Sequence, residues 1–217
     1  MIRLRLPKES SERLTVLCIG AHSDDIEIGC GGTVLKLAEE FPSSEFHWVV
    51  FSATGAREAE ARKGADQFAG VEKLKGPILK SFRDGFMPFV GAEVKDVFEE
   101  VKSISPDLIF THNRRDAHQD HRLLAELTWN TFRNHMILEY EIPKYDGDMG
   151  QPNFFVPLSS EQYQRKVRNI MDTFKSQHGK HWFRDETFTG LMRIRGMECN
   201  AESGYAEAFY SRKVQLY

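Results

Sequence analysis

Along the chain, segments with the apolar pattern of a buried strand alternate with segments that have the pattern of a helix. Residues 14–19, LTVLCI, form a short apolar run of the kind that is buried on both faces of a parallel sheet. Residues 33–40 read as a helix that ends before Pro42, and residues 46–51 read as a second strand. This succession predicts a βαβ unit near the start of the chain.

The same alternation continues toward the middle of the sequence. We predict a polar, Ala-rich helix over 56–68, a strand over 77–82, a helix over 93–103 and a strand over 107–111. Strands that alternate with helices favour a doubly wound sheet. We therefore expect an α/β fold with one Rossmann-like domain over residues 1–217, a mostly parallel sheet and helices on both faces. Any active site should lie at the carboxyl ends of the strands.

Residues 139–156, EYEIPKYDGDMGQPNFFV, interrupt this regular pattern with prolines, glycines and aromatic residues. They predict a long loop, either a lid over a ligand or a cover over the core. Ser159 and Gln162 then have the spacing of a capping box, which marks the start of a helix. One face of that helix is apolar and consists of Val167, Ile170, Met171 and Phe174.

Composition narrows the class of protein. The chain has 29 basic and 32 acidic residues, a net charge of −3, and 41% hydrophobic residues. This balance predicts a sizeable core and no nucleic-acid partner. The odd number of cysteines, Cys18, Cys30 and Cys199, argues against a disulfide framework. Residues 1–11 lack the pattern of a signal peptide, and no stretch is apolar enough for a membrane span. We therefore expect a cytoplasmic protein. Whether it forms a homo-oligomer is left open.

Candidate chemistry follows the first predicted strand, in residues 20–32, GAHSDDIEIGCGG. One histidine and three carboxylates lie here within six residues. His22 and Asp25, three positions apart across a tight turn, can converge on one point while Asp24 projects to a neighbouring one. This spacing suits two metal ligands and one free carboxylate.

The same stretch contains Gly29, Gly31 and Gly32, which would let the backbone come close to the site. These glycines lack the G-x-G-x-x-G spacing of a dinucleotide-binding loop. We therefore do not expect NAD to bind here.

A second cluster, THNRRDAHQDHRL, begins at the end of the strand predicted over 107–111. Its polar residues are His112, Asp116, His118, Asp120 and His121. In the first turn of a helix His118 and His121 point the same way, and the buried stripe of that helix is Leu123, Leu124 and Leu127. Zinc binds imidazole nitrogen and carboxylate oxygen, and a catalytic site keeps three protein ligands. His22, Asp25 and one of these two histidines complete such a set.

A single histidine or acidic pair would carry little weight, because most such residues have ordinary structural roles. We assign those roles to the remaining histidines, which are His47, His135, His178 and His181. Two clusters at predicted strand ends of one sheet, with complementary ligands, indicate a metal site instead.

The first cluster, AHSDDIEIGCGG, resembles the A-H-P-D-D-x-E-x-x-x-G-G signature of the PIG-L/LmbE family of zinc-dependent N-deacetylases, and DAHQDH resembles the H-x-D-H signature of that family. Looser similarities cover most of the chain: Arg57 with Glu60, Asp84 with Gly85, Ser176 with Gln177, and residues 195–209, RGMECNAESGYAEAF. Ser23 departs from the family pattern, which has proline there. Proline would stiffen the turn, so Ser23 leaves the rigidity of the ligand loop open.

The resemblance implies that His22, Asp25 and His121 bind the metal and that Asp24 is the general base. The tetrahedral oxyanion needs a further donor, for which His118 as an imidazolium is the candidate, and Asp120 or Asp116 could orient His118 or His121. Arg57 and Asp84 could contact sugar hydroxyls. The metal would be one Zn²⁺ per chain, with Fe²⁺ as the alternative.

The activity that the resemblance implies is removal of the N-acetyl group from a small N-acetylglucosamine-type conjugate. Two functions of other classes remain open. A metal-dependent phosphoesterase would use similar ligands but commonly two metal ions. A catalytically silent carbohydrate-binding protein would keep the fold without a general base.

Overall fold

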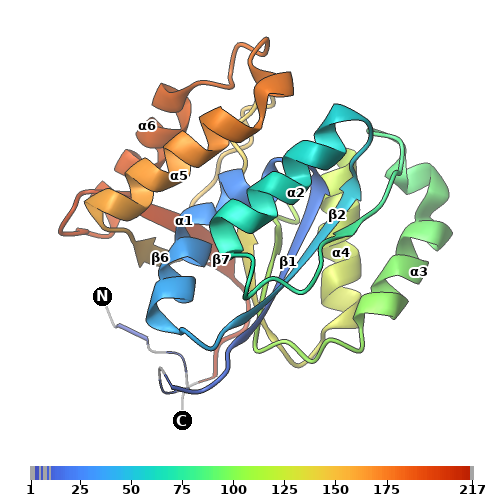
Figure 1. Cartoon of the computed structure of the whole chain (residues 1–217), viewed down its shortest axis with the longest axis horizontal. Helices are drawn as coiled ribbons and strands as arrows, with labels where there is room; N and C mark the ends of the chain where they lie inside the picture. Colours follow the sequence, from blue (N-terminus) through green and yellow to red (C-terminus); the bar gives the residue numbers. More distant parts are fainter. Residues whose placement is uncertain (1–2, 5, 7–8, 10, 216–217) are drawn as a thin grey trace.

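One sheet forms the centre of the molecule in this computed structural model, which describes residues 3–4, 6, 9 and 11–215. The seven strands found there have the order β3-β2-β1-β4-β5-β7-β6 (Figure 1). Their bounds are Thr15–His22 for β1, Glu45–Ser52 for β2, Ile78–Leu79 for β3, Leu108–His112 for β4, Met136–Tyr140 for β5, Phe154–Pro157 for β6 and Ala206–Ser211 for β7. Strands β1 to β5 are parallel, whereas β7 is antiparallel to both β5 and β6. The predicted, mostly parallel sheet is therefore confirmed.

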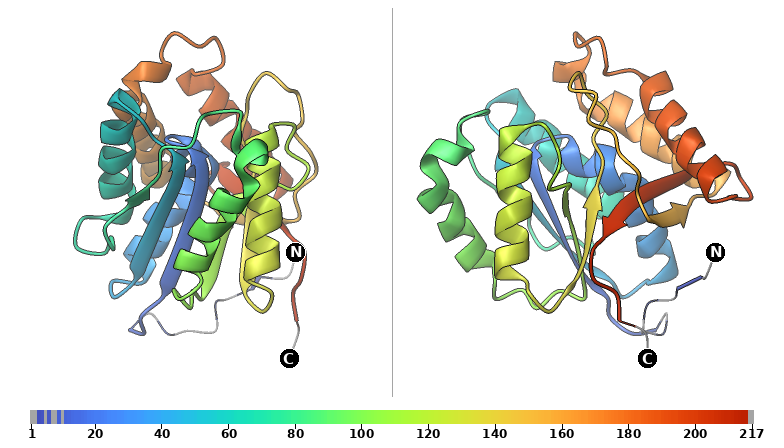
Figure 2. Two further views of the ribbon diagram at one scale, coloured as in Figure 1. Left: turned by 90° about the vertical axis from the view of Figure 1, so that its right-hand side faces the viewer. Right: turned by 180° about the vertical axis from the view of Figure 1, so that it is seen from behind.

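Helices cover both faces of this sheet, as a doubly wound fold requires (Figure 2). The α-helices are α1 (Asp25–Glu40), α2 (Ala56–Ala69), α3 (Gly91–Val101), α4 (Gln119–Thr131), α5 (Ser160–Thr173) and α6 (Asp185–Glu198), and the 3-10 helices are η1 (Met87–Val90) and η2 (Lys175–Gln177). Helices α1, α2, α5 and α6 contribute to the core on one face, and α3 and α4 to the core on the other. Within the described part of the chain, no helix is both long enough and apolar enough to cross a membrane.

Strand β1 shows why its sequence is continuously apolar. Val16 and Cys18 pack into the core on one face of the sheet, while Leu17, Ile19 and Ala21 pack into the core on the other, and all five are fully buried. Burying a side chain as large as Val or Leu stabilises the fold by roughly 1.5–3 kcal/mol relative to exposure. The strand is therefore fixed in place between its neighbours β2 and β4.

The chain connections change direction within the sheet beside β1. The chain leads from β1 to β2 on one side, whereas β4 lies on the other side. Such a switch point between neighbouring parallel strands is where open α/β sheets bind ligands. His22 is the last residue of β1 and His112 is the last residue of β4, so both sequence clusters meet here.

Helix α1 begins earlier than predicted, at Asp25 rather than at Thr33. The glycines of the first cluster lie inside this helix, and their backbones approach other core side chains closely. A Cβ at Gly29 would lie 2.2 Å from Tyr140, one at Gly31 would lie 2.5 Å from Phe68, and one at Gly32 would lie 2.5 Å from Leu158. Helix packing therefore explains these glycines, which we expected to let the backbone come close to the site.

The long loop is shorter than predicted, since its ends belong to β5 and β6 and only residues 141–153 lie between these strands. The buried guanidinium of Arg195 holds both ends of this segment. It donates to Glu141 over 2.9 and 2.7 Å and to the carbonyl of Gly150 over 3.1 Å. The segment is therefore a fixed wall against α6.

Other expectations about local structure can be compared directly with the structure. The capping box is confirmed, because the backbone and side chain of Ser159 and Gln162 bond each other reciprocally. The cysteines are free and buried. The strand predicted over 77–82 contains only the short β3, which lies at the edge of the sheet. Two charged residues of the N-terminal stretch 1–11, Arg5 and Lys8, lie outside the described residues.

Candidate metal centre

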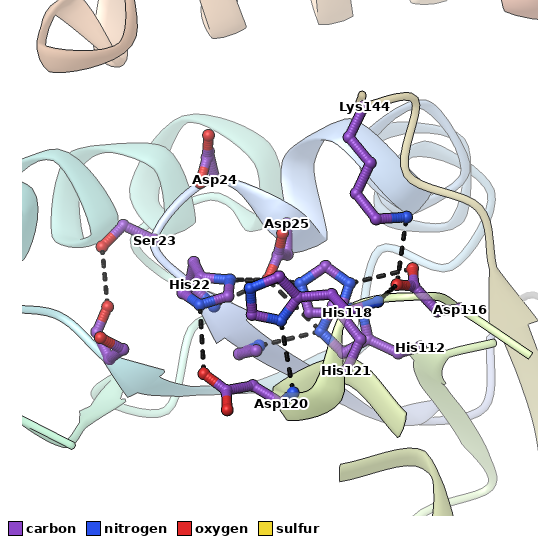
Figure 3. A network of polar contacts seen from close by, with 12 residues as sticks. His22, Ser23, Asp24, Asp25, His112, Asp116, His118, Asp120, His121 and Lys144 are labelled. Carbon is purple, nitrogen blue, oxygen red and sulfur yellow. Dashed lines mark hydrogen bonds and ion pairs between the residues drawn. The ribbon is translucent and has the colours of Figure 1, made fainter. Parts of the chain in front are cut away.

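Three potential ligand atoms converge at the end of β1 (Figure 3). Nδ1 of His22 lies 3.2 Å from Nε2 of His121 and 3.3 Å from Oδ2 of Asp25, and these last two atoms are 3.5 Å apart. A tetrahedral zinc site with ligands at about 2.0–2.1 Å has neighbouring ligand atoms about 3.3 Å apart. The spacing of the three atoms therefore fits a single divalent metal.

Local backbone structure brings these side chains together. His22 ends β1, Asp25 begins α1 and His121 lies in the first turn of α4. The backbone N–H of His22 donates to Oδ2 of Asp25 over 2.7 Å, which fixes the carboxylate relative to the strand. Ser23, where the family signature has proline, is fully buried, and its hydroxyl lies 3.5 Å from the carbonyl oxygen of Ser52 at the end of β2. Burial and this contact hold the turn between β1 and α1.

A carboxylate lies against the second nitrogen of each imidazole. Nε2 of His22 is 2.9 Å from Oδ1 of Asp84, and Nδ1 of His121 is 2.9 Å from Oδ2 of Asp116. Such carboxylate partners fix the tautomer and orientation of metal-binding histidines. Asp84, which we expected to contact a sugar, thus lies beside His22, and Asp116 is the carboxylate beside His121.

The charge of the cluster also suits a cation. Burial alone would raise the pKa of Asp25, but the imidazoles of His121, His112 and His22 hold it well below its usual range. The hydrogen bond to His22 lowers the pKa of Asp84 to about 2. Burial opposes protonation of His22, yet Asp25 and the carboxylates of Asp120 and Asp84 raise its pKa well above 6.5. The site is therefore rich in ionised carboxylates and favours positive charge.

Asp24 lies next to the ligand set but outside it. Figure 3 shows its carboxylate pointing away from the imidazoles. Nη2 of Arg57, from the first turn of α2, donates to Oδ1 of Asp24 over 2.7 Å. Burial raises the pKa of Asp24, and the Arg57 guanidinium opposes that rise. Arg57, which we also expected to contact a sugar, thus contacts Asp24 in this structure.

His118 caps the N-terminus of α4 and faces the cluster. Its Nδ1 accepts from the backbone N–H of Asp120 over 3.3 Å, and its ring centre lies 4.9 Å from that of His22 and 4.6 Å from that of His121. Burial, together with the His121 and His22 imidazoles, lowers the pKa of His118 below 6.5. The structure therefore favours the neutral imidazole over the imidazolium that we expected from the sequence.

Asp120 fixes the turn that contains Asp84. Its carboxylate accepts from the backbone N–H groups of Gly85 and Met87 over 2.7 and 3.2 Å. Oδ2 of Asp120 also lies 3.6 Å from Nε2 of His22. Asp120 therefore contacts the predicted site through His22, while its two short hydrogen bonds are with the backbone.

His112 lies deeper in the site than the sequence indicated. It is fully buried, Nε2 accepts from the backbone N–H of Ala21 over 2.9 Å, and its ring stacks on that of His121 at 3.8 Å. We named His112 in the second cluster without giving it a role. Its position at the end of a buried strand was the available signal.

Lys144 is a further member of this network, and no sequence pattern pointed to it. Its Nζ lies 3.0 Å from Oδ1 of Asp116.

The histidines to which we gave ordinary roles do not belong to the possible ligand groups found among the described residues. Glu60 and Ser176, from two of the looser family similarities, bond each other over 2.8 and 2.6 Å.

Comparison with known proteins agrees with these motifs. A family model, PIG-L, described as GlcNAc-PI de-N-acetylase, matches residues 17–132, which include both clusters. The chain belongs to the PIG-L family.

Three solved structures show that the fold recurs among enzymes of different reactions. N,N'-diacetylchitobiose deacetylase from Pyrococcus horikoshii is 20% identical, with a TM-score of 0.74 over 96% of this chain and 87% of that chain. The 4-carboxy-2-hydroxymuconate hydratase GalB from Pseudomonas putida KT2440 is 17% identical, with a TM-score of 0.73 over 94% of this chain and 98% of that chain. A zinc-inhibited form of the teicoplanin deacetylase Orf2 is 13% identical, with a TM-score of 0.69 over 91% of this chain and 97% of that chain. At these identities the likeness concerns the fold alone.

Proposed function

We propose that this protein is a metal-dependent hydrolase that removes the N-acetyl group from an N-acetylated amino sugar of the N-acetylglucosamine type. One observation carries the proposal: the potential ligand atoms of His22, Asp25 and His121 lie 3.2 to 3.5 Å apart, with the carboxylate of Asp24 beside them. Membership of the PIG-L family and the two deacetylases of similar fold support it.

The metal would be held by His22, Asp25 and His121. Two imidazoles and a carboxylate suit Zn²⁺, and Fe²⁺ is the alternative for the same ligands. When bound, such a metal polarises a carbonyl oxygen and lowers the pKa of a water ligand to about 7.

Asp24 is the general base in this proposal. Its carboxylate accepts a proton from the water that attacks the amide carbonyl and then delivers that proton to the leaving amine. The ion pair with Arg57 stabilises the ionised form of Asp24, which is the form that can accept a proton. Arg57 therefore acts on the base rather than only on the substrate.

His118 stabilises the negative charge that develops on the carbonyl oxygen. Because its Nδ1 accepts from the backbone of Asp120, the proton of the neutral ring is on Nε2, which faces the cluster. A donor that is already oriented costs no reorganisation when the oxyanion forms. Asp120 and Asp116 support the site by holding the turns on which Asp84 and His118 lie.

The substrate would enter at the strand ends as a small molecule. The side chain of Asp84 is 60% exposed. One of its carboxylate oxygens can therefore contact a sugar hydroxyl while Oδ1 contacts His22. The segment 141–153 would form one wall of the entrance. We treat residues 1–217 as one catalytic domain.

Acetate release tests this proposal. Zinc-loaded protein is offered a panel of N-acetylated sugar conjugates, and acetate and free amine are measured together. We expect equal amounts of both from at least one conjugate, and release at least about 10²-fold slower from the Asp24→Asn variant. Release of phosphate from sugar phosphates, or no reaction with any N-acetyl conjugate, would contradict the proposal.

Because a hydratase has a similar fold, the experiment should also include an assay for hydration. GalB is named as a hydratase, so the fold alone does not select amide hydrolysis. Addition of water to an unsaturated carboxylic acid, measured by loss of ultraviolet absorbance, is the matched assay. We expect no such activity, and a turnover faster than that of acetate release would favour a hydratase.

A further inference from the structure

Lys144 is a buried cation among acidic groups. It lies in segment 141–153, and its side chain is only 10% exposed. Its Nζ lies 3.0 Å from Asp116, 2.6 Å from Asp148 and 3.9 Å from Asp146. Figure 3 shows the ammonium directed at Asp116, on the side of the cluster opposite Asp120.

Asp116 connects this ammonium with a predicted metal ligand. Oδ1 of Asp116 receives Lys144 and also accepts from the backbone N–H of His118 over 2.8 Å. Oδ2 of the same carboxylate lies 2.9 Å from Nδ1 of His121. An ammonium, a carboxylate and an imidazole therefore form one continuous chain.

The burial of Asp116 explains why this chain needs a cation. The carboxylate is only 4% exposed, and a buried carboxylate is costly unless charged or polar partners surround it. The His121 imidazole is one such partner, through the contact of its Nδ1 with Oδ2. Lys144 supplies a full positive charge beside Oδ1 of Asp116 and a contact that holds this oxygen in place.

A second contact fastens the same segment to the same turn. Oδ2 of Asp148 accepts from Lys144 and also from the backbone N–H of Ala117 over 2.7 Å. Ala117 lies between Asp116 and His118. The position of segment 141–153 is thereby tied to the turn that precedes α4.

We propose that Lys144 is a positioning residue of the metal centre, which acts through Asp116 to hold the imidazole of His121 in the orientation that binds metal. The inference rests on the proposed function, because it takes His121 to be a ligand. Its consequence is that segment 141–153, far from the ligands in sequence, contributes to metal affinity.

Zinc affinity measured by competition with a chromophoric chelator tests this role in four proteins: wild type, Lys144→Met, Lys144→Arg and Glu141→Gln. Loss of a partner behind a metal ligand typically lowers metal affinity by 10–100-fold. We expect a loss of about tenfold in Lys144→Met, with most of the affinity kept in Lys144→Arg. Glu141→Gln is the matched control, because it weakens the attachment of the same segment to Arg195 but touches neither Lys144 nor Asp116.

Two additional readouts separate positioning from simple stabilisation. Melting of the metal-free proteins reports folding, and Lys144→Gln replaces Lys144→Met if the latter does not fold. The visible absorption of Co²⁺-loaded protein reports ligand geometry, and we expect it to change in Lys144→Met but not in Glu141→Gln. In an Asp116→Asn background, the effect of Lys144→Met on zinc affinity should disappear.

The outcomes are distinguishable. Wild-type zinc affinity in Lys144→Met, with a fall in melting temperature like that of Glu141→Gln, would overturn the positioning role and leave the proposed function intact. A wild-type protein that binds no divalent metal would contradict both. An undiminished effect of Lys144→Met in the Asp116→Asn background would show that Lys144 does not act through Asp116.

Discussion

Arg57 and Asp24 form an ion pair, in which Nη2 of the arginine lies 2.7 Å from Oδ1 of the aspartate. The Asp24 side chain is 5% exposed and that of Arg57 is 22% exposed, so the pair is largely removed from water. A guanidinium at this distance favours the ionised carboxylate. The general base of the proposed reaction is thus kept charged and aligned by a neighbour from α2.

Replacement of Arg57 by Met should therefore lower kcat. Misplacement of a catalytic group commonly costs about 10²-fold in rate, and we expect a loss of that order with little change in KM. Arg57→Lys should recover part of the activity because it keeps the charge. Steady-state kinetics with the preferred substrate measures both constants. A raised KM with unchanged kcat would instead support the sugar contact that the sequence indicated.

Asp24→Asn should suppress turnover while the metal stays bound. The amide keeps the shape of the side chain but has no basic oxygen, and loss of a positioned base typically costs about 10²–10⁴-fold in rate. Metal analysis of the same sample is the control, because it shows whether the ligand set is intact. Near-normal turnover in Asp24→Asn would assign the proton transfer to another group.

Removal of the charge from Lys166 should destabilise the fold more than most single changes. Nζ of Lys166 lies 2.6 Å from Glu207, both side chains are 3% exposed, and Glu207 also accepts from the backbone N–H groups of Gly32 and Thr33 in α1. Breaking a buried ion pair from one side typically costs about 3–5 kcal/mol. Urea denaturation of Lys166→Met should show a loss of that size.

The exposed pair Arg62 and Glu58 provides the matched control for this measurement. These side chains are 52% and 48% exposed, and such pairs contribute less than about 1 kcal/mol. Arg62→Met should therefore leave the free energy of unfolding nearly unchanged. Equal losses in Lys166→Met and Arg62→Met would show that burial does not determine the importance of the Lys166 pair.

His135 should make stability depend on pH without any involvement of the site. Burial lowers its pKa below 6.5, and its ring packs edge-to-face against Phe132. The folded state thus disfavours the charged form, so this contribution to stability is complete above the unfolded pKa of 6.5 and is lost as the pH falls from there through the lower pKa of the folded state. Melting temperatures at pH 7.5 and 5.5 should differ less in His135→Phe than in the wild type. An identical difference in both proteins would contradict the role of His135.

Much of the sheet could be predicted because its strands are buried on both faces. Continuous apolar runs such as residues 14–19 and 46–51 have few alternatives to a central parallel strand. The start of α1 could not be predicted in the same way. Glycines disfavour a helix locally, and only the close approach of Tyr140 and Phe68 in three dimensions explains why glycine is needed there.

The two clusters of the site could also be predicted, since parallel strands end at the same edge of a sheet. The partners of those residues could not. Asp84 reaches His22 across 62 positions and Arg57 reaches Asp24 across 33, and no spacing rule connects them. The tautomer and charge of His118 likewise depend on neighbours that only the folded chain brings together.

Metal content per chain, measured on purified protein after dialysis against Zn²⁺, tests the central claim most directly. Wild type should contain one zinc per chain and His121→Ala should contain little, because that variant loses one of three ligands. His118→Ala should still contain one, since His118 is placed as a donor to the oxyanion and not as a ligand. Undiminished zinc in His121→Ala, or two zinc ions per wild-type chain, would contradict the proposed metal centre.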